Sequence, residues 1–314
     1  QIDLDVATEV AKFLNIDHKI FEVNNIPSDD SISEQFNHKK GLNSIRMSFI
    51  IPFFKELRKV YGAHSFNFTG DGGDKMLVDL SPLYPIHTED ELVDYILKYN
   101  TRYHDVRKVC DIFNLPIGSL KEQIREIITG YPEKSIHNKY VHFIIYERAF
   151  KWLYEGEDRN RAYFWSTSPF YSVHFFKLAM QVSSRKKASY KLYRNFLFAI
   201  SPGVARLKNA NWNRRLNLNN IVYVHWLLEL LRKYPAVKKY IKRNVKPQHT
   251  ADAEFHFAFN YLRRKIDSNR RIYEHVIVIE KLETLLQNKE ELSKPFIYDM
   301  STIFQVLLDI KERE

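Results

Sequence analysis

Glycine and cysteine are scarce in this chain, and it has no long apolar run. Only 9 of its 314 residues are glycine, and Cys110 is the one cysteine. A lone cysteine cannot form an internal disulfide, and no stretch reaches the roughly 18 uninterrupted apolar residues of a membrane span. Residues 1–5 carry neither a basic nor an apolar leader pattern. These absences predict a reduced, cytoplasmic protein with no membrane partner, in which Cys110 is a small core residue.

Charge is distributed unevenly along the chain. Residues 1–99 contain 10 Lys and Arg against 16 Asp and Glu, whereas residues 183–271 contain 21 against 4. The formal net charge of +10 is therefore carried by the second half. A basic region of this kind either contacts an anionic partner or forms solvated helix faces that partly neutralise an acidic lobe, and we favour the second interpretation.

Helix and strand patterns alternate before Pro85. The predicted elements are, in order, a helix over 3–14, a strand over 18–23, a helix over 46–61 that ends at Gly62, and a strand over 64–68. Strands separated by helices predict a parallel sheet, and ligands bind at the carboxyl ends of such strands. Residues 69–74 lie at such an end.

Beyond Pro85 the strand pattern disappears and helical periodicity takes over. Helices are predicted over 89–99, 118–129, 134–154, 170–181, 189–200, 219–233, 252–268, 272–288 and 300–312. The charge-rich residues 155–161 have the composition of a solvated turn. The second part of the chain is therefore expected to be a helical lobe.

Three of the nine glycines fall within four residues, in the segment Thr69-Gly70-Asp71-Gly72-Gly73-Asp74. A glycine-rich acidic turn after a strand leaves backbone N–H groups for phosphate oxygens, and its carboxylates can hold the accompanying metal ion. A tight Asp-Gly turn that meets only solvent explains the same residues. The Walker, GxGxxG and EF-hand spacings do not fit. On these residues alone, both interpretations stay open.

Several short segments follow one another in a recognisable order. They are Val6–Leu14 with Asp17-His18, the loop 69–74, Asp158-Arg159, Pro169-Phe170, Tyr190–Arg194, and Arg206-Leu207-Lys208. Together they resemble the synthetase domain of asparagine synthetases, in the ATP-pyrophosphatase group of adenine nucleotide alpha-hydrolase-like proteins. The loop, similar to the S/T-G-D/E-G-x-D-E motif of that family, is the most specific match. The resemblance covers about residues 3–212.

The resemblance implies a fold, a reaction and a set of ligands. The fold would be α/β, with a partial parallel sheet of the adenine nucleotide alpha-hydrolase type followed by a mostly helical lobe. The reaction would be that of an amide-forming ligase of the glutamine-hydrolysing asparagine synthase type. ATP, with Mg²⁺, converts a side-chain carboxylate to an acyl-adenylate, which ammonia then attacks. The implied partners are a small carboxylate substrate and ammonia or glutamine.

The same resemblance assigns roles to individual residues. Asp74 would ligate Mg²⁺ on the pyrophosphate, and Asp71 would stand near the second substrate. Lys208 would neutralise charge on the phosphate or on the tetrahedral intermediate, although it is equally well explained as one more cation in a basic region. The approach of the backbone to the nucleotide is assigned to Thr69, Gly70, Gly72 and Gly73.

The chain also departs from the family pattern. The SGGxDS loop, expected upstream of Val6, and the glutaminase domain with its leading cysteine are not in the sequence. Lys75 replaces a glutamate beside the loop, Trp165 and Thr167 stand where the family has an E-x-R pair, and Ser172 replaces an aspartate. We therefore expect an acceptor other than aspartate, for example a sugar acid.

These patterns suggest three parts and leave two alternatives for the function. The parts are a partial nucleotide-binding α/β lobe over 1–85, a helical part of the synthetase domain over 86–212, and a helical C-terminal extension over 213–314. One alternative is a catalytically inactive scaffold, which Lys75 and the missing loop permit. The other is a basic helical nucleic-acid-binding protein, because tyrosines interleave with cations in three runs, 184–191, 238–243 and 260–265.

Overall fold

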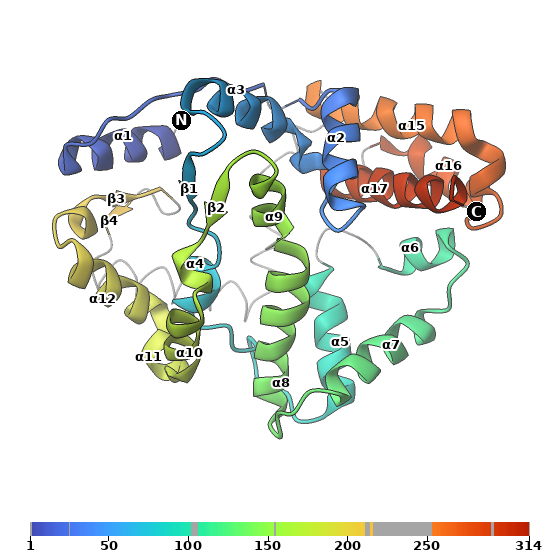
Figure 1. Cartoon of the computed structure of the whole chain (residues 1–314). Coiled ribbons are helices and arrows are strands. Elements are labelled where there is room, and N and C mark those ends of the chain that lie inside the picture. The colour runs from blue at the N-terminus through green and yellow to red at the C-terminus, as the bar shows by residue number, and fades with distance from the viewer. Residues whose placement is uncertain are drawn as a thin grey trace. The chain divides into compact units, whose positions relative to one another are not determined.

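The computed structural model is mostly helical and contains a small two-stranded parallel sheet (Figure 1). It describes residues 2–24, 26–101, 106–153, 155–210, 214–215, 253–289 and 292–313. The predicted helix 219–233 and the basic run 238–243 lie outside these residues. None of the helices within the described ranges is long and apolar enough to cross a membrane.

The chain divides into two compact units, each built from three separate segments. The first unit consists of Gln1–Glu22, Gly70–Leu80 and Ser168–Lys246, and the second of Val23–Thr69, Ser81–Thr167 and Pro247–Glu314. The chain passes from one unit to the other between Thr69 and Gly70 and again between Thr167 and Ser168. The segment 69–74 therefore contributes to both.

Most elements in the described part of the first unit are short helices. Its elements are α1 (Ile2–Leu14), α4 (Gly73–Met76), η3 (Pro169–Tyr171), α10 (Val173–Gln181), α11 (Ser184–Lys187), η4 (Ala188–Tyr190), α12 (Lys191–Ile200), η5 (Val204–Arg206), and the antiparallel pair β3 (Lys208–Asn209) and β4 (Arg214–Arg215). The predicted helix 3–14 is confirmed. The helix predicted over 189–200 begins at Lys191, because Ser189 and Tyr190 have left-handed backbone conformations, with φ of 53° and 58°.

The strand predicted over 18–23 is wrong. Residues 18–23 have no regular secondary structure, and His18, Lys19 and Ile20 are exposed. Alternation of side chains stabilises a strand only when one face is buried and the backbone finds a partner strand. Neither condition is met here in the described part of the chain.

The second unit holds the larger helices and the parallel sheet. Its elements are α2 (Asp29–Lys39), η1 (Ile45–Ile50), α3 (Ile51–Tyr61), β1 (Phe66–Phe68), α5 (Glu89–Asn100), α6 (Val106–Ile112), α7 (Ile117–Thr129), α8 (Ile136–Phe143), the π-helix η2 (Ile144–Leu153), α9 (Glu155–Arg161), β2 (Trp165–Thr167), α15 (Ala253–Tyr273), α16 (Ile279–Gln287) and α17 (Lys294–Lys311). Helices predicted over 89–99 and 118–129 and near the C-terminus are confirmed.

Proline and glycine set the limits of α3. Residues 46–50 of the predicted helix 46–61 belong instead to the 3-10 helix η1. The α-helix begins at Ile51 with Pro52 in its first turn, where a missing N–H costs no helical hydrogen bond. The helix ends at Tyr61, where Gly62 takes a φ of 80° and donates its N–H to the carbonyl of Arg58. The predicted end at Gly62 is confirmed.

The parallel sheet pairs β1 with a strand that the sequence did not predict. The two strands lie side by side (Figure 1). In their register, Phe66 lies opposite Trp165, and Phe68 lies opposite Thr167. The predicted strand 64–68 is thus real but shorter, and its partner comes from far along the chain, where only helices were expected. A parallel sheet is present, as predicted, but it is not made from residues 18–23.

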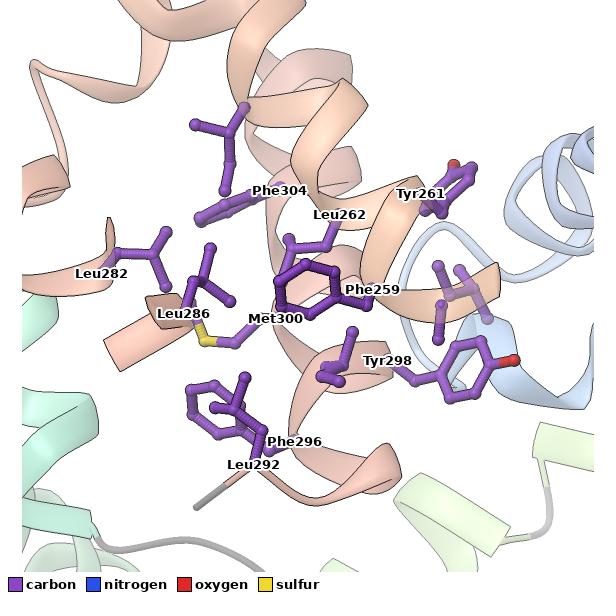
Figure 2. Close-up of a cluster of buried hydrophobic side chains, with 14 of the residues drawn as sticks. Phe259, Tyr261, Leu262, Leu282, Leu286, Leu292, Phe296, Tyr298, Met300 and Phe304 are labelled. Atoms are coloured by element: carbon purple, nitrogen blue, oxygen red, sulfur yellow. The ribbon is translucent and has the colours of Figure 1, made fainter. Parts of the chain in front are cut away.

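A large apolar core joins α15, α16 and α17 in the second unit (Figure 2). Leu262 and Phe304 are fully buried in it, and the ring of Tyr273 stacks on Phe304 with 4.5 Å between the centroids. Cys110 is also buried, and burial, followed by the nearby Asp111, raises the pKa of its thiol. The prediction of Cys110 as a core residue is confirmed.

Candidate functional site

Thr69 lies at the carboxyl ends of both parallel strands. Its backbone N–H donates to the carbonyl of Thr167 at 3.0 Å and continues the β1–β2 ladder by one step. Ligands of parallel sheets bind beyond the ends of the strands where such a loop begins. The predicted loop therefore starts at the edge where a ligand site is expected.

A buried carboxylate holds this strand end in place. Glu157 of α9 is fully buried and accepts hydrogen bonds from the hydroxyls of Thr69 and Ser166, the latter at 2.6 Å. Ser166 in turn accepts from the amide of Asn67 at 3.1 Å. Because a buried carboxylate is costly unless its oxygens are hydrogen-bonded, this network fixes the conformation of Thr69. The hydroxyl of Thr69 is thus already engaged within the protein.

The solvated turn predicted over 155–161 is wrong. These residues form α9, and Glu157, Arg159 and Asn160 are buried. The guanidinium of Arg159 lies 5.4 Å from the ring centroid of Phe54 and donates to the side chain of Asn160 at 3.1 Å. The charged composition of residues 155–161 predicted exposure to solvent. The prediction failed because the buried face of α9 is itself polar and hydrogen-bonded.

In the first unit, the loop continues from Gly70 into the short helix α4. The hydroxyl of Ser168 donates to the carbonyl of Asp71, and the N–H of Gly73 donates to the carbonyl of Gly70 at 3.2 Å. Within the described residues, no backbone carbonyl accepts from the N–H groups of Gly70 or Asp74. The loop thus presents donors that a phosphate oxygen could accept from.

Packing explains two of the three glycines. Gly72 has a φ of +87°, and a Cβ there would lie 2.6 Å from the ring of Tyr171. A Cβ at Gly73 would lie 3.0 Å from the ring of Phe170, whereas at Gly70 it would meet nothing within 4 Å. Gly72 and Gly73 are therefore needed for the fit of the loop against η3, and only Gly70 is left for close approach to a ligand.

The two aspartates of the loop are exposed. The side chain of Asp74 is 70% exposed and forms an ion pair with Lys75, whose own side chain is only 13% exposed. Asp71 is also exposed. A carboxylate in this position fits the oxygen donors that Mg²⁺ prefers, since Mg²⁺ is commonly held by one or two carboxylates together with substrate phosphates. Any metal at Asp74 would compete with Lys75.

No larger metal centre accompanies Asp74. Among the residues that the structure describes, no three His, Cys, Asp or Glu side chains lie together as a metal-binding group. A cation at the loop would therefore depend on phosphate oxygens for most of its ligands.

Lys187 was missed by the sequence reasoning. This side chain, at the end of α11 in the first unit, is 6% exposed. Burial lowers the pKa of Lys187, and the nearby carboxylate of Asp79 opposes that shift. Two residues with left-handed backbone conformations, Ser189 and Tyr190, follow after Ala188. The sequence shows only that Lys187 lies in a basic run, and such a run is typical of a solvent-exposed helix face.

Lys208 belongs to the same unit as the loop from Gly70 onward. It opens β3, pairs with Arg215 across the short antiparallel ladder, and is exposed. No interaction in the described part of the chain connects it with Asp71 or Asp74. Its assigned role in charge neutralisation stays a prediction.

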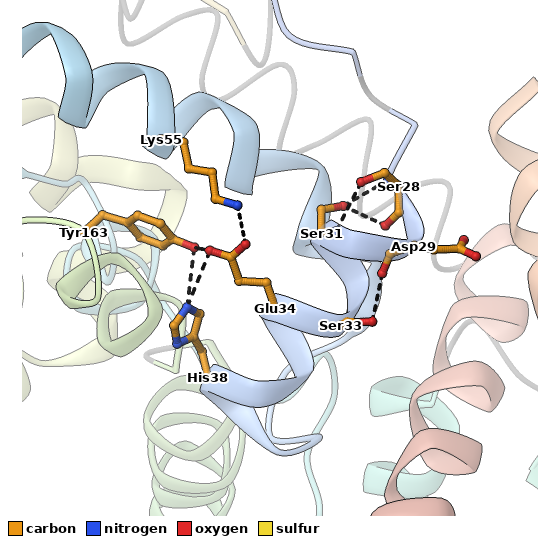
Figure 3. Close-up of polar contacts among 8 residues, drawn as sticks. All are labelled: Ser28, Asp29, Ser31, Ser33, Glu34, His38, Lys55 and Tyr163. Atoms are coloured by element: carbon orange, nitrogen blue, oxygen red, sulfur yellow. Dashed lines mark hydrogen bonds and ion pairs between the residues drawn. The ribbon is translucent and has the colours of Figure 1, made fainter.

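A separate polar cluster lies on α2 in the second unit (Figure 3). Glu34 accepts from the hydroxyl of Tyr163 at 2.5 Å and pairs with Lys55, and His38 lies 3.9 Å from the same carboxylate. Although burial opposes it, the hydrogen bonds from Lys55 and Tyr163 hold the pKa of Glu34 below its ordinary value. Burial, followed by the bond to Glu34, raises the pKa of Tyr163. The cluster ties α2, α3 and the residues before β2 together.

Comparison of this chain with protein-family models, with curated proteins and with solved structures finds no match. The fold class, a helix-rich α/β arrangement with a parallel strand pair in the described residues, therefore rests on the structure alone.

Proposed function

We propose that this chain is an ATP-dependent, amide-forming ligase of the asparagine synthetase type, acting on a carboxylate other than aspartate. The observation that carries the proposal is the position of the glycine-rich acidic loop. It begins directly at the carboxyl ends of two parallel strands, and the backbone N–H groups of Gly70 and Asp74 have no backbone acceptor among the residues that the structure describes. The motif order along residues 3–212 supports the same interpretation.

In the proposed reaction, an oxygen of the substrate carboxylate attacks the α-phosphorus of ATP and pyrophosphate leaves. Ammonia then attacks the acyl carbon, loses a proton to solvent, and displaces AMP. The N–H groups of Gly70 and Asp74 would donate to phosphate oxygens, and the carboxylate of Asp74 would hold Mg²⁺ after separating from Lys75. When bound, Mg²⁺ supplies charge neutralisation at the pyrophosphate. Lys208 would offer a further cation.

Pyrophosphate release provides the test. The full chain is incubated with Mg·ATP, ammonia and a panel of small carboxylates that includes aspartate and sugar acids, and pyrophosphate is measured. We expect carboxylate-dependent release, lowered at least about a hundredfold by Asp74→Asn, because a metal-holding carboxylate acts in the transition state. Asp3→Asn, at an exposed position on α1 of the same unit, is the control and is expected to keep full activity. Equal rates in the two variants would contradict the proposal.

The ion pair between Lys75 and Asp74 favours a second candidate, the catalytically inactive scaffold. A lysine held against the only carboxylate assigned to Mg²⁺ reverses the charge expected beside a triphosphate. Lys75→Gln distinguishes the two candidates. A ligase should bind Mg²⁺ at least as well in this variant, whereas a scaffold should release no pyrophosphate in either form.

The basic run 260–265 gives the nucleic-acid alternative no support. Tyr261, in the middle of the run 260–265, is 4% exposed and packs into the core of the second unit. A buried ring cannot stack on a base. This tyrosine serves the fold, so the interleaved pattern of residues 260–265 does not form a stacking surface.

A further inference from the structure

A hollow of about 550 Å³ lies in the second unit, between the end of α3 and the residues that lead from α9 into β2. Arg58, Arg161, Tyr163 and Trp165 are among the residues that line it. The hollow lies at the start of β2. It is therefore a different site from the glycine-rich loop, which follows the carboxyl end of β1. The volume falls in the range that holds small molecules.

Positive charge dominates the lining of this hollow. Its described lining residues include two arginines and no acidic side chain. Arg161 is partly balanced, because it pairs with Asp158 at 3.0 Å and donates to the carbonyl of Ser166 at 3.2 Å. Arg58 donates only to a neutral carbonyl, that of Ala162 at 3.5 Å, and no carboxylate of the described residues pairs with it. The planar guanidinium of an arginine that pairs with no carboxylate can still donate two hydrogen bonds to an anion.

An exposed aromatic surface adjoins these arginines. Trp165 is 64% exposed, and its ring stacks on Phe66, which is 71% exposed, at 6.4 Å between centroids and 23° between planes. Adjacent aromatic side chains that are exposed to solvent beside a hollow are typical of binding surfaces. A flat ligand could extend the existing stack.

We propose that this hollow binds a small planar anion, an aromatic ring that stacks on Trp165 and carries a phosphate or carboxylate held by Arg58 and Arg161. The proposal does not depend on the ligase function, because its residues belong to the second unit and none of them is assigned to ATP. AMP combines a ring and a phosphate and is a suitable probe.

Tryptophan fluorescence of the full chain tests the proposal. AMP should quench the emission in a saturable manner, and adenosine or inorganic phosphate alone should bind more weakly, since each lacks one of the two contacts. Trp165→Phe should lose the quench but retain labelled AMP in equilibrium dialysis. Asp74→Asn should leave the AMP titration unchanged, which separates this hollow from the glycine-rich loop.

A matched pair of variants on α3 tests the role of the unpaired arginine. Arg58→Met should weaken AMP binding about tenfold, as expected for the loss of one charge-assisted hydrogen-bonding group. Lys59→Met removes the same charge from the next residue, which pairs with Glu56 outside the hollow, and should change affinity less than about twofold. Arg58→Lys should lie between the two, and circular dichroism confirms that each variant is folded.

Three outcomes would overturn the proposal. AMP could fail to bind the unaltered chain. Arg58→Met and Lys59→Met could weaken binding equally, which would identify a non-specific basic surface. Single-stranded oligonucleotides could bind where AMP does not, which would make this face a nucleic-acid surface instead.

Discussion

At the scale of single residues, buried and partly buried carboxylates hold separate segments of this protein together. Glu157 fixes Thr69 at the end of β1, and Glu34 joins Lys55 to Tyr163. Each carboxylate gains hydrogen bonds that offset the cost of leaving water. Hydropathy patterns do not identify such glutamates, because glutamate usually occupies solvent-exposed positions.

Glu34 makes stability depend on pH in a defined direction. Its carboxyl pKa is lower in the folded chain than its ordinary value of 4.5. The ion pair therefore contributes fully above that value and is lost as the pH falls through the lowered folded pKa. Glu34→Gln should cost about 1 kcal/mol of unfolding free energy at pH 7 and less at pH 3.

Urea unfolding of the unaltered chain and of Glu34→Gln at the two pH values measures this difference. The exposed pair of Lys59 and Glu56 provides the control, because Glu56→Gln should change stability little at either pH. A cost for Glu34→Gln that is the same at pH 3 and pH 7 would show that the charge of Glu34 is not what stabilises the cluster.

At the scale of elements, the loop and α4 depend on a backbone conformation that only glycine adopts easily. Gly72→Ala should lower the unfolding free energy by about 1–3 kcal/mol, because it places a side chain at positive φ and against the ring of Tyr171. Gly70→Ala is the matched control, since its Cβ meets nothing within 4 Å.

Thermal unfolding of the two glycine variants decides this point. If Gly72→Ala were as stable as Gly70→Ala, the packing of the loop against Tyr171 would not be as described. Gly70→Ala has a second use, because a ligand that approaches the backbone at Gly70 should bind this variant less well even though its stability is unchanged.

Elements with an apolar stripe were predictable from the sequence, and those with a polar buried face were not. Helices such as α5 and α7 were found because their apolar residues repeat at helical spacing. In α2, by contrast, Ser31, Gln35 and Lys39 are buried beside two apolar residues, so the pattern is weak. The strand β2 has three residues and pairs with a partner a hundred positions away, and no local signal reveals such a pairing.

The candidate site was predictable only in part for the same physical reason. The loop 69–74 was visible because three glycines in a glycine-poor chain stand out. The side chains that support it, Glu157 and Ser168, come from distant segments and look like ordinary polar residues in the sequence. Their roles depend on tertiary contacts that a single sequence does not encode locally.

At the scale of the whole molecule, both units are assembled from interleaved segments of the chain. The chain passes between them after Thr69 and after Thr167, directly beyond β1 and β2. Thr69 continues the strand ladder in the second unit, and in the first unit Ser168 donates to the carbonyl of Asp71. Such a connection is well suited to a binding loop, because function commonly lies on loops positioned by regular elements.

Binding of Mg·ATP by this loop is tested most directly by isothermal titration calorimetry. The Arg58→Met variant is used as the starting protein, so that binding at the hollow beside Trp165 is weakened. We predict saturable binding of one ATP that requires Mg²⁺ and is weakened about tenfold or more by adding Asp74→Asn. Absence of binding, or equal affinity with and without the Asp74 carboxylate, would contradict the assignment of residues 69–74 as a nucleotide site.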